Sequence, residues 1–179
     1  AAALAELLHE SRRAVIFTGA GMSTESGIPD FRSPGGIWTK MQPIEFRDYL
    51  SDPGARRLSW QRRLEMEETW NTVKPNRGHH AVADLVARGK ASHVITQNID
   101  GLHQQSGVPD DKLIELHGSA RYAKCLDCGT RIEISDILGH FTAHGEAPDC
   151  THCGGLVKTA TISFASPCRK ARWPVPTPP

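Results

Sequence analysis

Short apolar segments rich in β-branched residues alternate along this chain with longer segments whose apolar residues recur at helical spacing. The first kind predicts buried strands, which we expect at residues 14–18, 91–96 and 112–117. The second kind predicts helices over residues 3–12, 43–50, about 55–71 and 76–88. Strands that alternate with helices predict an α/β fold with a parallel sheet.

The amino-acid composition changes twice after the third predicted strand. Cysteines, turns and short polar runs fill residues 121–158, which indicates a small module inserted in the α/β domain. The chain then ends in a segment, 166–179, where five of the twelve prolines lie, and such a segment is expected to be extended or disordered. At 179 residues, the chain is long enough for one domain that carries an inserted module.

Charge and composition exclude some classes of partner. The formal net charge is +1, because 21 basic residues nearly balance 20 acidic ones, so there is no nucleic-acid signal. No apolar run approaches the length that spans a bilayer, and we expect no membrane partner. Four of the five cysteines fall in CxxC pairs, which favours metal binding in a reducing compartment and predicts a cytoplasmic location.

The segment from Gly19 to Arg32 follows the first predicted strand and contains several residues suited to ligand binding. A strand that ends in Gly-x-Gly lets the backbone turn tightly beside a ligand, and the next helix then offers its N-terminus to a phosphate. Ser23 and Thr24 are able to cap that helix or bind a phosphate. Asp30, Phe31 and Arg32 add a carboxylate, an aromatic ring and a guanidinium. The alternative interpretation is an ordinary turn followed by a solvated polar loop.

Two CxxC pairs, Cys125/Cys128 and Cys150/Cys153, are separated by twenty-one residues. Four thiolates from two tight turns complete a closed tetrahedral zinc shell with no open position for catalysis. Gly129 and Gly154 follow the pairs and let backbone amides turn toward the sulfurs. The alternative is a pair of redox-active dithiols, which would favour a helix N-terminus after the first cysteine of each pair.

Polar residues follow the second and third predicted strands. Gln97, Asn98 and Asp100 stand at the carboxyl end of the second strand, where α/β folds place their ligands. His117 ends the third strand and precedes a glycine. A histidine with an ordinary pKa of about 6.5 is suited to general-base catalysis near neutral pH, so His117 is preferred among the nine histidines.

These motifs together resemble the sirtuins, which are NAD-dependent protein deacylases, in their bacterial type. The resemblance runs from about residue 4 to Phe164 and is carried by residues 19–32, 96–103, His117-Gly118 and the four paired cysteines. It implies a Rossmann-like NAD-binding domain, begun by residues 1–120, with a zinc-binding module at 121–158 inserted in it. Residues 159–165 then resemble the strand that returns to the large domain.

The resemblance also implies roles for individual residues. Contacts to NAD are expected from Ala20, Ser23, Thr24, Asp30, Phe31 and Arg32, with close backbone approach at Gly19 and Gly21. Gln97 and Asn98 would hold the ribose next to nicotinamide, and Ile99 and Asp100 would recognise the nicotinamide carboxamide. His117, with Asn98 beside it, would act in catalysis by deprotonating a ribose hydroxyl. The implied products are free lysine, nicotinamide and O-acyl-ADP-ribose.

The ending departs from the family pattern, because Ala165 stands where a glycine is expected and the later Rossmann strands are missing. The expected explanation is a truncated or frame-shifted product. The main hypothesis is an NAD-dependent protein deacylase whose partner is a protein with an acylated lysine. The alternatives are mono-ADP-ribosyl transfer and an inactive fragment that acts at most as a zinc-binding interaction module. A dehydrogenase would not explain Asn98, Asp100 and the zinc cysteines together.

Overall fold

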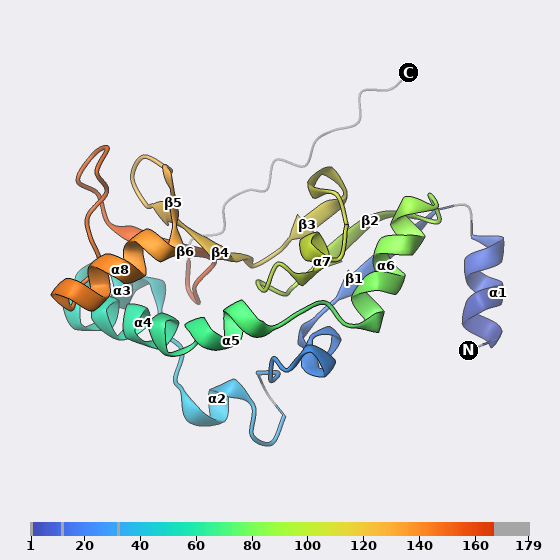
Figure 1. The fold of residues 1–179 in the computed structure, drawn as a ribbon, viewed down its shortest axis with the longest axis horizontal. Coiled ribbons are helices and arrows are strands. Elements are labelled where there is room, and N and C mark those ends of the chain that lie inside the picture. The colour runs from blue at the N-terminus through green and yellow to red at the C-terminus, as the bar shows by residue number, and fades with distance from the viewer. Residues whose placement is uncertain (1, 12, 32, 167–179) are drawn as a thin grey trace.

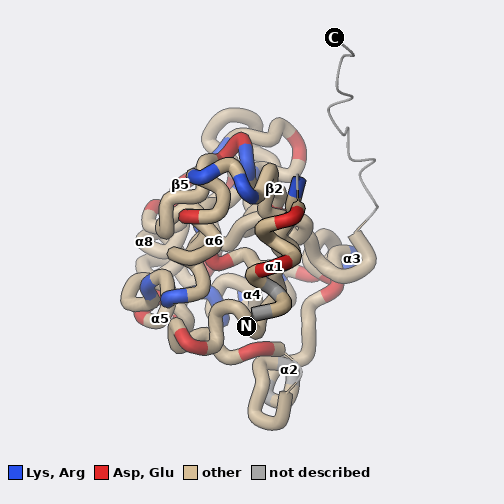
Figure 2. Tube along the Cα trace, turned by 90° about the vertical axis from the view of Figure 1, so that its right-hand side faces the viewer, with Lys and Arg blue, Asp and Glu red and all other residues tan. Residues whose placement is uncertain are grey.

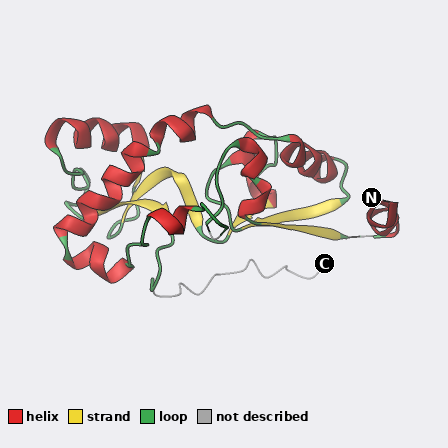
Figure 3. Cartoon of the chain, turned by 90° about the horizontal axis from the view of Figure 1, so that it is seen from below, coloured by secondary structure: helices red, strands yellow, loops and turns green. Residues whose placement is uncertain are grey.

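The computed structural model describes residues 2–11, 13–31 and 33–166. Arg32 and almost all of the proline-rich tail, both subjects of sequence predictions, lie outside the described residues. The described part forms two lobes with a sheet in each (Figures 1 and 3). Acidic and basic residues are interspersed along the trace in Figure 2, in keeping with the net charge of +1.

The first lobe is built on a parallel sheet, as predicted. Its strands are β1 (Ala14–Thr18), β2 (Ala91–Thr96) and β3 (Leu113–Glu115), in the order β1-β2-β3. Thr18 pairs with Thr96, and Thr96 with Glu115, so the three strands end at one edge. The predicted strand 112–117 was too long at both ends, because Lys112 closes a 3-10 turn (η3, Asp110–Lys112) and the chain leaves the sheet before His117.

Helices α1 (Ala2–Glu10), α6 (Arg77–Ala87) and α7 (Leu102–Gln105) belong to this lobe. The α6 helix begins where the Asn76 side chain accepts hydrogen bonds from two backbone amides of its first turn. Its apolar face packs on β2 in a core cluster whose buried residues are Val82, Val86, Ala91, Val94 and Val108. No helix of the described residues is long and apolar enough to cross a membrane.

The second lobe is built on an antiparallel sheet with the order β5-β4-β6. Its strands are β4 (Gly118–Cys125), β5 (Arg131–Glu133) and β6 (Val157–Thr161). The α8 helix (Ile134–His144) covers this sheet with Ile134, Ile137, Leu138 and Phe141. Only turns and short polar runs were expected here, and α8 was missed, although its apolar residues follow helical spacing.

Four further helices, α2 (Ile37–Lys40), α3 (Phe46–Ser51), α4 (Pro53–Glu65) and α5 (Glu67–Thr72), precede α6. The single helix predicted over 55–71 was wrong, because the chain is interrupted at Met66 between α4 and α5. Trp60 of α4 is buried in the core of the second lobe, where its Nε1 donates to the Tyr49 hydroxyl (2.9 Å). That hydroxyl donates to the Val157 carbonyl (2.6 Å), so helices from the first half of the chain are tied to β6.

Candidate active site and metal centre

The glycine-rich segment leaves β1 at the carboxyl edge of the parallel sheet. The Gly-x-Gly turn was predicted to lead into an α-helix, but the described residues directly after Gly19 form none. Two 3-10 turns, Ala20–Met22 and Thr24–Ser26, stand there instead. The amides of Met22 and Ser23 are used within the first turn, so they do not form the N-terminus of a longer helix. A methyl group on Gly21 would meet no protein atom within 4 Å, so the backbone has an open side there.

Three buried polar side chains link the glycine-rich segment to the loop after β2. The Ser23 hydroxyl donates to Asp100 Oδ2 (2.7 Å) and accepts from Asn98 Nδ2 (3.1 Å). Asn98 Nδ2 also donates to the Gly19 carbonyl (3.0 Å). Asp100 Oδ1 accepts from the Leu102 amide (2.9 Å). These bonds fix Asn98 and Asp100 against the first turn of the segment and thereby preorganise this wall of the site.

His117 stands at the same edge, beyond the end of β3. Its Nδ1 lies 2.9 Å from the Gln97 carbonyl oxygen, and because a carbonyl only accepts, Nδ1 carries the proton. Nε2 of the neutral ring is then an unprotonated base. The ring is exposed, and Gly118 turns the chain behind it with φ = 72°. A methyl group on Gly118 would lie 2.1 Å from the Ala160 carbonyl oxygen, so glycine is required at this turn.

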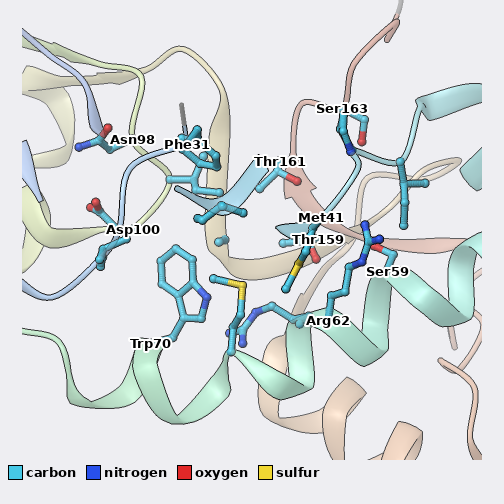
Figure 4. A pocket seen from close by; sticks show the side chains of 18 of the residues that line it. Phe31, Met41, Ser59, Arg62, Trp70, Asn98, Asp100, Thr159, Thr161 and Ser163 are labelled. Carbon is cyan, nitrogen blue, oxygen red and sulfur yellow. The ribbon is translucent and has the colours of Figure 1, made fainter. Parts of the chain in front are cut away.

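A cavity of about 270 Å³ opens beside these residues, between the two lobes (Figure 4). Of the predicted site residues, those that line it are Ala20, Ser23, Phe31, Asn98, Ile99 and Asp100. The other described residues predicted for NAD binding and catalysis, which do not line it, are Gly19, Gly21, Thr24, Asp30, Gln97 and His117. Thr24 is exposed and donates to the Gly21 carbonyl (3.0 Å). Asp30 accepts from the Ser33 amide (2.9 Å).

The opposite walls of the cavity were not predicted from the sequence. They come from α4, α5, the turn between these two helices and β6, and include Ser59, Arg62, Met66, Trp70, Lys158, Thr159 and Thr161. Figure 4 shows Trp70 projecting from the helices toward the space between Asp100 and Met41. Lys158 is 6% exposed, and burial lowers its pKa to about 8. The available signal was a lysine directly before the predicted return strand at residues 159–165.

The four paired cysteines converge at the far end of the second sheet. All four Sγ atoms lie within 4.8 Å of one another, with 3.5 Å between Cys125 and Cys153 and 3.7 Å between Cys128 and Cys150. A tetrahedral site with Zn–S bonds of about 2.3 Å requires sulfurs about 3.8 Å apart. The tetrathiolate therefore fits zinc, which would hold the two turns together and has no open position for chemistry.

The glycines after the two cysteine pairs turn the chain so that the amides after them face the sulfurs, as expected. The amides of Gly129 and Gly154 donate to the carbonyls of Cys125 and Cys150 (3.1 and 2.7 Å), which closes each turn. Both glycines have φ = 75°, a conformation that other residues rarely adopt. Backbone hydrogen bonds to sulfur come from the next positions, Thr130 and Gly155. The turn is thus built by the glycines, and the thiolates are supported by the amides that follow them.

A parallel sheet with a polar carboxyl edge and an inserted tetrathiolate module defines a Rossmann-like α/β protein with a zinc-binding lobe. The sequence matches the Sir2 family over residues 19–172. It is 52% identical over 161 residues to NAD-dependent protein deacetylase 1 of Bradyrhizobium diazoefficiens, covering 90% of this chain and 63% of that protein. It is 49% identical to the NAD-dependent protein deacetylase of Rhodopseudomonas palustris, covering 90% and 64%.

Solved structures similar to this chain also belong to Sir2 proteins. A structure described under the mechanism and regulation of Sir2 enzymes is 40% identical with a TM-score of 0.75, covering 92% of this chain and 64% of that one. A complex of Sir2 with a p53 peptide and NAD+ is 34% identical with a TM-score of 0.73, covering 91% and 64%. The chain belongs to the Sir2 family, the sirtuins. It spans a little under two thirds of the length of the two deacetylases that it matches.

Proposed function

We propose that the chain carries the catalytic edge of an NAD-dependent protein lysine deacylase. The observation that supports this most directly is the placement of His117, whose Nδ1 bonds to the Gln97 carbonyl and leaves Nε2 available as a base, at the sheet edge that also holds Asn98 and Asp100 beside the cavity. Relatives of the chain are named NAD-dependent protein deacetylases, and one similar structure contains NAD+ and a peptide. The proposed partner is a protein with an acylated lysine.

The residues present fit NAD. Gly21 leaves its backbone open to a ligand, and Ile99 and Asp100 line the cavity, where a backbone amide and a carboxylate are suited to a carboxamide. Gln97 and Asn98 are proposed to hold the neighbouring ribose, and Ala20, Thr24, Phe31 and Arg32 to contact the rest. When bound, NAD supplies a ribose that accepts the acyl group after nicotinamide leaves. His117 Nε2 takes a proton from a ribose hydroxyl.

With one water consumed to release the amine, the products are then a free lysine, nicotinamide and O-acyl-ADP-ribose. Phe31 is half-buried on the cavity wall, where a ring shields the reacting centre from water. Zinc is proposed to act only as a support for the second lobe, because the four thiolates leave no coordination position for a substrate. We propose a cytoplasmic location, since thiolates stay reduced there.

Turnover of an acetyl-lysine peptide tests the proposal. The chain is incubated with NAD, and mass spectrometry follows the peptide, nicotinamide and acyl-ADP-ribose. We expect NAD-dependent loss of acetyl that disappears in His117→Ala. It should persist in His80→Ala, which removes an exposed histidine of α6. ADP-ribose attached to protein would favour mono-ADP-ribosyl transfer. Absence of turnover from a folded chain with one zinc bound would favour a zinc-binding interaction module.

A further inference from the structure

Behind the loop that carries Asn98, four buried polar residues join four elements of the first lobe. They are Thr18 at the end of β1, Thr96 at the end of β2, His79 of α6 and His103 of α7. His79 is fully buried and His103 is 1% exposed, while the two threonines are 8% and 2% exposed. None of these four residues lines the cavity, so they lie outside the proposed binding surface.

Hydrogen-bond directions fix the protonation of His103. The Thr18 hydroxyl donates to Thr96 Oγ1 (2.8 Å), so its single proton is already used. His103 Nε2 lies 2.9 Å from the Thr18 oxygen, and with the Thr18 proton directed at Thr96 it donates to that oxygen. Burial lowers the pKa of His103 to about 4, which keeps the ring neutral at pH 7. In that neutral ring Nδ1 carries no proton, and it is a buried acceptor without a partner in the described residues.

His79 has the complementary arrangement. Its Nδ1 accepts from the Asn76 amide (3.3 Å), so the proton of the neutral ring is on Nε2. Nε2 is buried and has no partner in the described part of the chain. The centres of the two rings are 5.0 Å apart. The two ring nitrogens make no direct hydrogen bond to each other, and one water between the donor on His79 and the acceptor on His103 would satisfy both.

The hydrogen-bonded residues on either side of the histidine pair reach the walls of the candidate active site. At one end, the Asn98 amide donates to Thr96 Oγ1 (3.0 Å). At the other, the side chain of Asn76 donates to the Met22 carbonyl (2.8 Å) and to Ser26 Oγ (3.0 Å), in the two 3-10 turns of the glycine-rich segment. The histidine pair thus connects the loop after β2 with the turns after β1 by a route behind the cavity.

We propose that His103 and His79 are positioning residues for the NAD site. The pair holds the backbone of Asn98 in register with the glycine-rich turns, with the proton of His103 on Nε2 and the proton of His79 also on Nε2. Neither ring contacts the ligand. The role in binding rests on the proposed function, whereas the protonation pattern rests on the hydrogen bonds alone.

Nitrogen NMR of the intact chain tests the protonation pattern without any turnover. Spectra of ¹⁵N-labelled protein at pH 7 report which ring nitrogen of each histidine is protonated. We expect an unprotonated Nδ1 and a protonated Nε2 on both His103 and His79. A proton on Nδ1 of His103, or a doubly protonated ring, would overturn the proposal whatever the enzyme does.

Two substitutions of one residue test the positioning role. His103→Leu removes the donor to Thr18, whereas His103→Gln places an amide NH₂ near the position of Nε2. Affinity for NAD is measured by calorimetry, with His80→Gln as the control on α6. We expect His103→Leu to bind NAD about tenfold more weakly, the change that matches one buried hydrogen bond. His103→Gln should recover most of the affinity, and in turnover the KM for NAD should rise more than kcat falls.

The outcomes separate the two proposals. A folded His103→Leu variant that binds NAD as tightly as the parent chain refutes the positioning role. If His103→Leu does not fold, two other measurements decide whether the positioning role holds. They are the NAD affinity of His103→Gln relative to the parent chain and the histidine protonation pattern from NMR. If the parent chain neither binds nor turns over NAD, the proposed function fails. The positioning role is then judged by the Asn98 amide resonance, which must shift in His103→Leu and stay near its original position in His103→Gln.

Discussion

Replacing Lys158 by methionine is expected to stabilise the folded chain at neutral pH. The ammonium is buried on the wall of the cavity, and its Nζ donates to the carbonyls of Thr161 (2.7 Å) and Thr159 (3.2 Å). No carboxylate of the described residues forms an ion pair with it. Burial alone lowers its pKa from the ordinary 10.5 to about 8, which means that the folded state disfavours the charged form.

The size of the effect follows from this difference in pKa. The lowering from 10.5 to about 8 corresponds to about 3 kcal/mol of differential stability between the two protonation states. Below pH 8 the lysine is charged in both the folded and the unfolded chain, so the whole cost is present. Between pH 8 and 10.5 the folded chain loses its proton first and the cost declines. Above pH 10.5 it disappears.

Methionine fills a similar volume without a charge, but two carbonyls then lose a donor, which costs about 1 kcal/mol. The net gain in the free energy of unfolding at pH 7 is therefore about 2 kcal/mol, or about 4–8 °C in Tm for a chain of this size. Urea unfolding at pH 7 and pH 10 measures it, with exposed Lys90→Met as the control. A Lys158→Met chain that is no more stable at pH 7, or a gain equally large at pH 10, would refute the reasoning.

Three further predictions concern other buried contacts. Tyr49→Phe removes the hydroxyl between Trp60 and Val157 and should lower the free energy of unfolding by about 1–3 kcal/mol in urea titration; an unchanged midpoint contradicts this. Gly118→Ala should cost at least about 2 kcal/mol more than Gly89→Ala, because both have positive φ but only Gly118 has a backbone oxygen in the way; equal losses would show that the turn relaxes freely. The lowered pKa of His103 means that the unfolded chain binds its proton first. Stability should therefore fall by up to about 3 kcal/mol as pH drops from 6.5 to about 4, more steeply than in His103→Gln; parallel pH profiles would exclude this.

Features that depend on neighbours in the sequence were predictable. The strand at residues 14–18 and the one at 91–96 have the bounds expected, because a run of β-branched residues between polar positions favours a strand. The first is not the buried strand that was predicted, since Val15 and Phe17 are 53% and 59% exposed. The four cysteines were predicted as one centre because two tight CxxC turns leave few other arrangements. The family resemblance is confirmed by the match to the Sir2 family.

Features that depend on contacts between distant segments were not predictable from the sequence. Trp70 and Lys158 line one cavity, although 88 positions separate them in the numbering, and no local pattern encodes that meeting. The glycine-rich segment was expected to open a helix because a Gly-x-Gly turn often does. Here the segment forms short 3-10 turns instead. Ser23, at the end of the first turn, is hydrogen-bonded to Asp100 and Asn98. The roles of the individual site residues stay predictions.

The two long strands of the second sheet connect the thiolates to His117. Cys125 pairs with Val157 at the end of the ladder next to the metal centre, and Gly118 pairs with Thr161 at the other end. A strand of eight residues such as β4 spans about 25 Å. Removing the metal would free the distal ends of both strands and loosen the backbone behind His117. In any test of the proposed activity, the rate should therefore be expressed per mole of bound zinc, since we expect protein lacking the metal to be inactive.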